Sequence, residues 1–244
     1  MRWHFRSYNF TLANYWAPFL LQADFLSKGK VNLHLDALDN EWTTNYQKHD
    51  CILLASSPWF STPTIIMEND TIVGCHSCNG QFKELGSFYL YQRALQMAFN
   101  FTITSDHKPL VIFRTWSVEH INYRKGFKGG FCDRTTPYDE GEHEDTPTGQ
   151  KNYAIDMEEF KRAVAIGSEN GTRLKLLDIY HLSLLRPDGH PGPYMHFRPF
   201  DKDKHAQVEN DCVHWCLPGP IDVWNDLLME MVLKEGTISL KDIS

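Results

Sequence analysis

Leu110 to Trp116 reads LVIFRTW, a short run of β-branched, aliphatic and aromatic residues bounded by turn residues. Two other runs have the same character, Cys51 to Ser56 (CILLAS) and Arg173 to Leu182 (RLKLLDIYHL). Short apolar runs of this kind are typical of buried strands. We therefore expect these segments to form neighbouring, mostly parallel strands of one sheet.

Helical patterns separate the expected strands. One runs from Glu84 to Phe99, and a second runs from Asp156, among acidic residues, to Ser168. A last helix is expected from about Ile221 to Val232, after the Pro-Gly-Pro sequence that begins at Pro218. Strands that alternate with helices predict an α/β domain with a mainly parallel sheet.

Length and charge limit the classes of protein to consider. The chain has 244 residues, of which 42% are apolar, enough to bury the core of one substantial domain. The formal net charge of −7 offers no basic field for nucleic acid. Residues 1–10 resemble neither a signal peptide nor a membrane anchor, and no run approaches the roughly 18 apolar residues of a membrane span.

Other features indicate a secretory compartment. Asn-x-Ser/Thr glycosylation acceptors occur at Asn9, Asn69, Asn100 and Asn170. The six cysteines have the character of a disulfide set, which forms in oxidising compartments. Because these features require a leader that the sequence does not show, we expect an N-terminal part of the protein to lie outside this sequence.

The segment Asp211 to Gly219 reads DCVHWCLPG and carries the candidate chemistry. An Asp and a His three residues apart in a turn can lie side by side, so that the carboxylate of Asp211 orients the imidazole of His214. This would supply two members of a nucleophilic triad. The motif alone is common, and a surface His beside a solvated Asp is the alternative.

The residues around this motif resemble the C-terminal signature of the trichome-birefringence-like family. The match includes DCVHWCLPG and the DVWN that begins at Asp222. Further blocks occur in the family's order: YNFT from Tyr8, YWAPFL from Tyr15, FRTWS from Phe113, GGFC from Gly129, LLDI from Leu176, LS from Leu182 and RPDGHP from Arg186. Together the blocks cover essentially the whole chain.

The resemblance implies an SGNH-hydrolase-like α/β sandwich with a mainly parallel sheet, of which residues 1–244 would be the C-terminal part. It implies a Golgi-lumen O-acetyltransferase, anchored in the membrane through a missing N-terminal segment. The acceptor would be a cell-wall polysaccharide. The donor would be an acetyl co-substrate, with acetyl-coenzyme A as one candidate, and no bound cofactor or metal is expected.

Within that family, Asp211 and His214 match the catalytic Asp and His. The family's nucleophilic Ser lies in a Gly-Asp-Ser motif, which does not occur in this sequence. We therefore expect the N-terminal part that carries the Ser to be missing and this chain alone to be inactive. The GCHSC block that begins at Gly74 favours the branch that acetylates xyloglucan over the one that acetylates xylan.

The family resemblance also implies that Cys132 pairs with Cys212 or Cys216. The remaining cysteine of the latter two would then have a partner in the missing part. One departure from the family bears on activity. Relatives commonly carry Gly-His-Trp after the first strand, where this chain has Ser57-Pro58-Trp59.

Several alternatives remain open at this level. Arg114 and His190, near expected strand ends, could contact a sugar, but Arg114 could instead anchor a carboxylate and His190 could shape a turn. Trp215 could stack on a sugar or pack in the core. A zinc site is disfavoured because one pair is Cys-x-x-Cys and the other is Cys-x-x-x-Cys, far along the chain. The rival functions are a non-catalytic polysaccharide-binding pseudoenzyme and a carbohydrate acetylesterase.

Overall fold

The computed structural model describes residues 1–55, 58–122, 130–142 and 145–235. The chain divides into two compact units, each assembled from separate stretches of sequence. The sheet unit comprises Met1–Thr115, Lys151–Leu177 and the chain from Met231 onward. The loop unit comprises Trp116–Gln150 and Asp178–Glu230.

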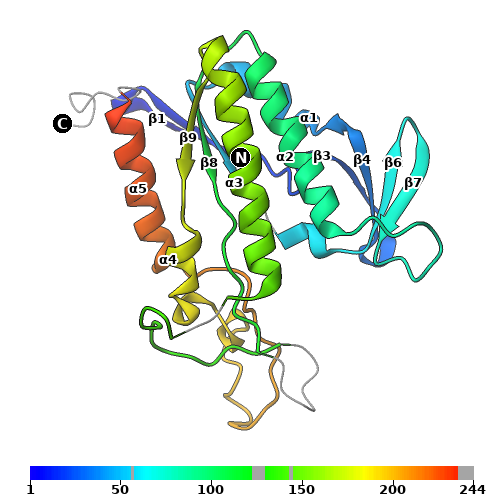
Figure 1. Cartoon of the computed structure of the whole chain (residues 1–244). Helices are drawn as coiled ribbons and strands as arrows, with labels where there is room; N and C mark the ends of the chain where they lie inside the picture. Colours follow the sequence, from blue (N-terminus) through cyan, green and yellow to red (C-terminus); the bar gives the residue numbers. More distant parts are fainter. Residues whose placement is uncertain (56–57, 123–129, 143–144, 236–244) are drawn as a thin grey trace. The chain divides into compact units, whose positions relative to one another are not determined.

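A parallel sheet of strands β5 (Cys51–Ala55), β8 (Leu110–Arg114) and β9 (Arg173–Leu177) lies in the sheet unit, in that order (Figure 1). Leu53 is level with Ile112, which is level with Lys175. The expectation of neighbouring parallel strands is thus confirmed. The central strand β8 is an apolar run because both its faces are covered.

Helices α2 (Ser87–Thr104) and α3 (Pro147–Gly167) lie side by side in Figure 1. The ring of Phe113 on β8 lies 5.1 Å from that of Phe99 on α2 and 6.3 Å from that of Phe160 on α3, measured between centroids. Through these three rings, both helices pack against the central strand β8. Such aromatic pairs add to the stability from apolar burial.

Each predicted helix exists, but three boundaries differ from the expectation, one of them because α2 continues beyond Phe99 to Thr104. Helix α2 begins at Ser87 and not at Glu84, because Gly86 has a φ of +82° and the carboxylate of Glu84 accepts hydrogen bonds from the N–H groups of Ser77 and Gly86. Helix α3 begins at Pro147 and not at Asp156. Proline suits the first turn of a helix, and Thr146 Oγ1 caps it by accepting the N–H of Gly149 at 3.0 Å.

The prediction of a strand as far as Leu182 was wrong at its C-terminal end. Strand β9 ends at Leu177, and helix α4 spans Tyr180–Leu184. Asp178 Oδ1 accepts the N–H of Tyr180 at 3.2 Å, and this turn begins a helix where the hydropathy still suits a strand. Helix α5 spans Pro220–Lys234, close to the predicted range.

A second sheet in the same unit was not predicted. Its strand order is β3 (Leu21–Phe25), β4 (Val31–Leu38), β6 (Thr64–Glu68) and β7 (Thr71–His76), with only β4 and β6 parallel. A separate hairpin joins β1 (Arg2–Phe5) to β2 (Phe10–Ala13). The short helix α1 spans Asn40–Thr43.

Among its described residues, the loop unit contains little regular structure besides α4, the first turn of α3 and most of α5. Backbone bridges join Asn122 to Phe131 and Gly192 to Asp211, and a disulfide joins Cys132 to Cys212. Within the described residues of both units, short 3-10 turns lie at Arg6–Tyr8, Ser27–Gly29, Tyr46–Lys48, Pro58–Ser61, Ser168–Asn170, Pro187–Gly189 and Pro193–Met195. None of the helices in the described ranges is both long and apolar enough to span a membrane.

Candidate active site

Asp211 and His214 lie together in one turn of the loop unit. Asp211 Oδ1 accepts the main-chain N–H groups of Val213 at 3.1 Å and His214 at 2.9 Å. Its second oxygen, Oδ2, lies 2.8 Å from His214 Nδ1. The carboxylate therefore builds the turn and orients the imidazole at once.

This contact fixes which ring nitrogen of His214 carries a proton in the neutral imidazole. A carboxylate only accepts, so Nδ1 donates to Asp211 and Nε2 keeps its lone pair. The His214 side chain is 75% exposed and that of Asp211 only 9%. A largely buried carboxylate that orients an exposed imidazole is the arrangement of the Asp and His in a nucleophilic triad.

The charge of Asp211 is maintained by its hydrogen bonds. Burial by itself would raise the pKa of this carboxyl group, but the N–H groups of His214 and Val213, together with the His214 imidazole, outweigh it. The pKa of Asp211 therefore lies below its usual value. The carboxylate stays ionised near neutral pH, where it can stabilise an imidazolium on His214.

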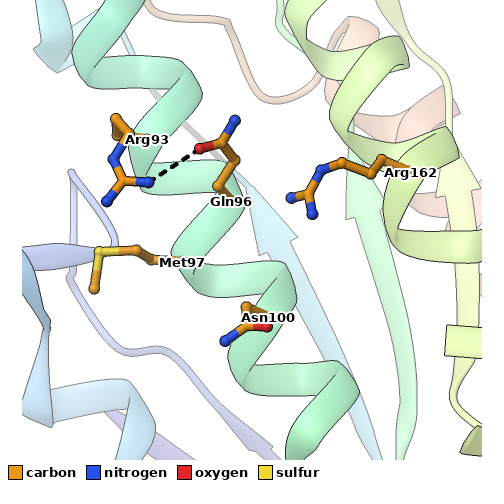
Figure 2. A pocket seen from close by; sticks show the side chains of 5 residues that line it. All are labelled: Arg93, Gln96, Met97, Asn100 and Arg162. Atoms are coloured by element: carbon orange, nitrogen blue, oxygen red, sulfur yellow. Dashed lines mark hydrogen bonds between the residues drawn. The ribbon is translucent and has the colours of Figure 1, made fainter. Parts of the chain in front are cut away.

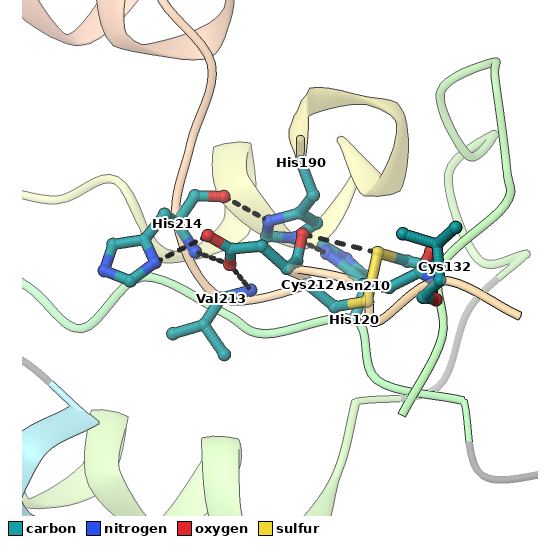
Figure 3. Close-up of a disulfide and its surroundings, with 9 residues drawn as sticks. His120, Cys132, His190, Asn210, Cys212, Val213 and His214 are labelled. Atoms are coloured by element: carbon teal, nitrogen blue, oxygen red, sulfur yellow. Dashed lines mark hydrogen bonds and ion pairs between the residues drawn. A yellow bond between two sulfur atoms is a disulfide. The ribbon is translucent and has the colours of Figure 1, made fainter. Parts of the chain in front are cut away.

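The turn is anchored from several sides. Gly192 and Asp211 exchange main-chain hydrogen bonds of 2.9 and 3.0 Å. The N–H of His120 donates to Cys212 O at 3.2 Å, and Cys212 is bonded to Cys132. Figure 3 shows His214 at one end of this turn and the disulfide at the other. The pairing of Cys132 with Cys212 is one of the two that the family resemblance implied.

His190 lies directly behind His214. Its Nδ1 donates to the main-chain oxygen of His214 at 2.7 Å, and its Nε2 lies 2.8 Å from Nδ1 of His120 (Figure 3). Burial is the main reason why the pKa of His190 lies below its usual value. His190 was a candidate from the sequence, whereas His120 was not. His120 lies 70 residues before His190, so no short sequence motif joins the two residues.

Trp215 packs against this pair of histidines. Its ring lies 4.2 Å from the ring of His190 and 5.2 Å from that of Trp224, between centroids. A Cβ added at Gly189 would lie 3.0 Å from the Trp215 ring, so this glycine allows the close packing. These contacts favour a packing role for Trp215, and sugar stacking stays a prediction.

Arg114 belongs to the sheet unit, at the end of β8. Burial lowers the pKa of its guanidinium, and the nearby Asp156 and Tyr91 oppose that effect. The hydroxyl of Tyr91 donates to Asp156 Oδ1. This arrangement favours the alternative in which Arg114 anchors a carboxylate inside the unit.

The remaining cysteines take separate roles. Cys75 bonds to Cys78, while Cys51 and Cys216 are free thiols. Ligand atoms of Cys75, Cys78 and Glu84 lie within 4.8 Å of one another, the sole such group among the described residues. Because both of its sulfurs are joined in the disulfide, this group lacks the thiolates that zinc requires.

The four predicted glycosylation acceptors are all exposed. Asn9 and Asn69 have positive φ angles in turns, Asn100 lies on α2, and Asn170 lies in the turn after α3. Exposure is the condition that an attached glycan requires.

Each unit has a hollow lined by described residues. One of about 540 Å³ in the loop unit is lined in part by Cys132, His190 and Asn210. The other, of about 460 Å³, lies on the helices of the sheet unit and is lined by Arg93, Gln96, Met97, Asn100 and Arg162 (Figure 2). Arg162 is already paired with Glu159 at 2.7 Å. Neither hollow includes Asp211 or His214 in its lining.

Comparison with known proteins identifies the family. Residues 1–231 match the model of PC-Esterase, described as the GDSL/SGNH-like acyl-esterase family found in Pmr5 and Cas1p. The chain is 42% identical over 234 residues to protein trichome birefringence-like 26 of Arabidopsis thaliana, a match that covers 95% of this chain and 53% of that protein.

Two relatives carry the name of an activity. Xyloglucan O-acetyltransferase 1 of Arabidopsis thaliana is 35% identical over 95% of this chain and 54% of its own length. The protein of the same name from Populus trichocarpa is 36% identical over 96% of this chain and 56% of its own length. The chain thus spans about half the length of the curated relatives it matches. By its family match and these identities, the chain belongs to the PC-Esterase family of GDSL/SGNH-like acyl-esterases, together with the trichome birefringence-like proteins and the xyloglucan O-acetyltransferases.

Proposed function

We propose that this chain contributes the acid–base pair of a polysaccharide O-acetyltransferase. The observation that carries the proposal is the 2.8 Å contact of Asp211 Oδ2 with Nδ1 of an exposed His214. That contact leaves His214 Nε2 able to take a proton. The nucleophilic Ser would come from the part of the relatives' length that this chain does not span.

In the proposed reaction His214 Nε2 removes the proton of the Ser hydroxyl as the hydroxyl attacks the acetyl donor. The acetyl group passes to the Ser oxygen, and the donor's leaving group takes the proton from His214. A sugar hydroxyl then gives its proton to His214 and attacks the acyl-enzyme. The acetylated sugar leaves, and the Ser oxygen regains the proton. Asp211 stabilises the imidazolium during both halves.

The names of the relatives support xyloglucan as the acceptor class. We place the enzyme in the Golgi lumen, membrane-anchored in its full-length form, with acetyl-coenzyme A as a candidate donor. The disulfide between Cys132 and Cys212 and the exposed acceptors Asn9, Asn69, Asn100 and Asn170 support an oxidising secretory compartment. In the same proposal, His190 and Trp215 of the loop unit are the candidates for contact with the acceptor or for its support.

A chimaera tests the proposal. The Gly-Asp-Ser-containing region of Arabidopsis xyloglucan O-acetyltransferase 1 is fused ahead of this chain, and transfer of labelled acetyl to a xyloglucan oligosaccharide is measured, with a xylan oligosaccharide beside it. We expect transfer by the chimaera and none by the 244-residue chain alone. His214→Ala should abolish transfer, whereas His196→Ala, at another exposed histidine of the loop unit, should not. Transfer by the unextended chain, or a chimaera indifferent to His214→Ala, would refute the assigned roles.

A second candidate is a polysaccharide-binding protein without turnover. It is favoured by one observation, that the 244 residues contain no Gly-Asp-Ser. Binding of the oligosaccharide by a chimaera that transfers no acetyl would support this candidate. Release of free acetate from an acetylated oligosaccharide, with no transfer to a second sugar, would instead support an acetylesterase, in which water reaches the acyl-enzyme.

A further inference from the structure

Two buried histidines, His120 and His190, are hydrogen-bonded to each other and to the main chain of the proposed catalytic base, His214. His120 is 7% exposed and His190 is 9% exposed. Three contacts form a continuous row from one main-chain oxygen to another. His120 Nε2 lies 3.0 Å from Leu184 O, His120 Nδ1 lies 2.8 Å from His190 Nε2, and His190 Nδ1 lies 2.7 Å from His214 O.

Two neutral imidazoles cannot complete this row of hydrogen bonds. A carbonyl oxygen only accepts, so His120 Nε2 and His190 Nδ1 must each carry a proton. The contact between the two rings needs one proton more. Two neutral imidazoles hold two protons between them, so a complete row holds one extra proton and one positive charge. In any neutral arrangement, one of the contacts would bring two lone pairs together.

Several groups face this charge. Asp188 interacts favourably with both rings and is itself held by Arg186 at 2.8 Å. Asp211 also favours the charged form of His190, whereas burial and His214 oppose it. The rings of Tyr138 and Trp215 lie 6.1 and 6.0 Å from that of His120, between centroids. The carboxylates of Asp188 and Asp211 therefore offset part of the cost of a buried charge, while burial prevails on His190 and keeps its pKa below the usual value.

The catalytic imidazole itself has little packing to hold it. Because the His214 side chain is 75% exposed, its direction depends on the hydrogen bonds of its own residue. Asp211 holds the N–H and Nδ1, and His190 holds the carbonyl oxygen. With both peptide groups fixed, only the side-chain torsions remain, and the contact of Nδ1 with Asp211 sets those.

We propose that His120 and His190 are positioning residues for His214, forming a buried pair that shares an extra proton and holds the main-chain carbonyl of His214. The catalytic part of this inference rests on the proposed function. The charged pair and its hydrogen bond to His214 O do not depend on the proposed function, because they follow from the three contacts of the two rings.

Matched amide variants test the pair. The amide nitrogen of Asn lies near the position of imidazole Nδ1, and that of Gln lies near Nε2. His190→Asn therefore keeps a donor for His214 O, whereas His190→Gln keeps the contact with His120 and releases the carbonyl. His120→Asn keeps a donor to His190 without any charge. His196→Gln, at an exposed histidine, is the control.

The first readout is made on the 244-residue chain and needs no activity. Because the pKa of His190 lies below its usual value, the extra proton should enter the pair only as the pH falls below the ordinary imidazole value of about 6.5. Nitrogen-15 NMR of the imidazole rings in that acidic range should show three protonated nitrogens on His120 and His190 together. His190→Gln should move the ring signals of His214, while His190→Asn and His196→Gln should leave them in place. Two protonated nitrogens, or His214 signals that ignore His190→Gln, would overturn the proposal even if another variant failed to fold.

The second readout is activity in the chimaera. His190→Gln should lower kcat about tenfold with little change in KM, the size expected for one lost hydrogen bond, and His190→Asn should recover most of it. Equal losses in the two variants would reject positioning through the carbonyl. An inactive parent chimaera with the expected NMR result would instead reject the proposed function and leave the charged pair standing.

Discussion

The carboxylate of Asp211 holds His214 at two points, the main-chain N–H at 2.9 Å and the ring Nδ1 at 2.8 Å. One side chain thus determines both the backbone turn and the direction of the imidazole. The two tasks use different oxygens, Oδ1 for the turn and Oδ2 for the ring. A substitution that keeps one oxygen and replaces the other can therefore separate folding from catalysis.

Asp211→Asn is that substitution. Its remaining oxygen still accepts the main-chain N–H groups, so the turn should persist. Its amide nitrogen donates to His214 Nδ1, which moves the ring proton to Nε2 and removes the base. We expect kcat in the chimaera to fall on the order of 10³-fold or more. Thermal unfolding, followed by circular dichroism, should change little, and a large loss of stability would show that the carboxylate's main task is structural.

The disulfide between Cys132 and Cys212 should contribute much of the stability of the loop unit, which has few regular elements. It joins residues 80 positions apart, a loop whose closure is worth about 4.5 kcal/mol in the chain-entropy model. Cys132→Ser with Cys212→Ser should lower the free energy of unfolding by about that amount. Denaturant unfolding that monitors the loop unit would measure the loss.

The other disulfide supplies the control. Cys75 and Cys78 are three positions apart, so their double Ser variant should cost about 2 kcal/mol or less. Cys216→Ser removes a thiol that has no disulfide partner and should cost least. Equal losses from the two double variants would contradict the dependence on loop length.

The candidate site could be predicted from the sequence as far as its contacts were local. Asp211 and His214 meet because three positions in a turn bring their side chains together. The contact of His120 with His190 spans 70 positions and depends on the tertiary fold. His190 was therefore predicted only as a sugar contact or a turn residue, and its hydrogen bond to His214 O was not foreseen.

For the fold as well, some elements could be predicted from the sequence and others could not. Strands such as β8, covered on both faces, are continuous apolar runs and were found. Strand β4 alternates in burial and contains His34 and Asp36, so no apolar run marked it. Tyr180–Leu182 continued the apolar run of β9, but the side chain of Asp178 started a helix there. Hydropathy locates buried strands, whereas side-chain hydrogen bonds decide where they end.

Arg114 should be a structural residue of the sheet unit. Asp156→Asn would remove one of the two groups, Tyr91 and Asp156, that oppose the effect of burial on the Arg114 guanidinium. We expect the free energy of unfolding to fall by about 3 kcal/mol, the size of the penalty when a buried charge loses a compensating charge. Asp106→Asn, at an exposed position of the same unit, should change it by less than about 0.5 kcal/mol. If urea unfolding shows no difference between the two variants, the role of Arg114 must be sought outside this cluster.

Glu159 should make the sheet unit sensitive to acid. The residue is 1% exposed, and its carboxylate accepts hydrogen bonds from Gln92 at 2.9 Å, Gln96 at 2.8 Å and Arg162 at 2.7 Å. Burial raises the pKa of this carboxyl group, but the three donors outweigh burial and hold the pKa below its usual value.

Because the folded-state pKa lies below the unfolded value of about 4.3, ionised Glu159 stabilises the fold above that pH, and the contribution disappears as the pH falls through the folded value. Glu159→Gln should therefore be less stable than the parent chain by about 2 kcal/mol near neutral pH. The difference should shrink steadily below about pH 4. Urea unfolding midpoints measured across this range would show the convergence.

Glu158→Gln, at the exposed neighbouring position, should follow the parent chain throughout. A difference between Glu159→Gln and the parent that stays constant with pH would mean that the Glu159 carboxyl group does not change its charge within that range.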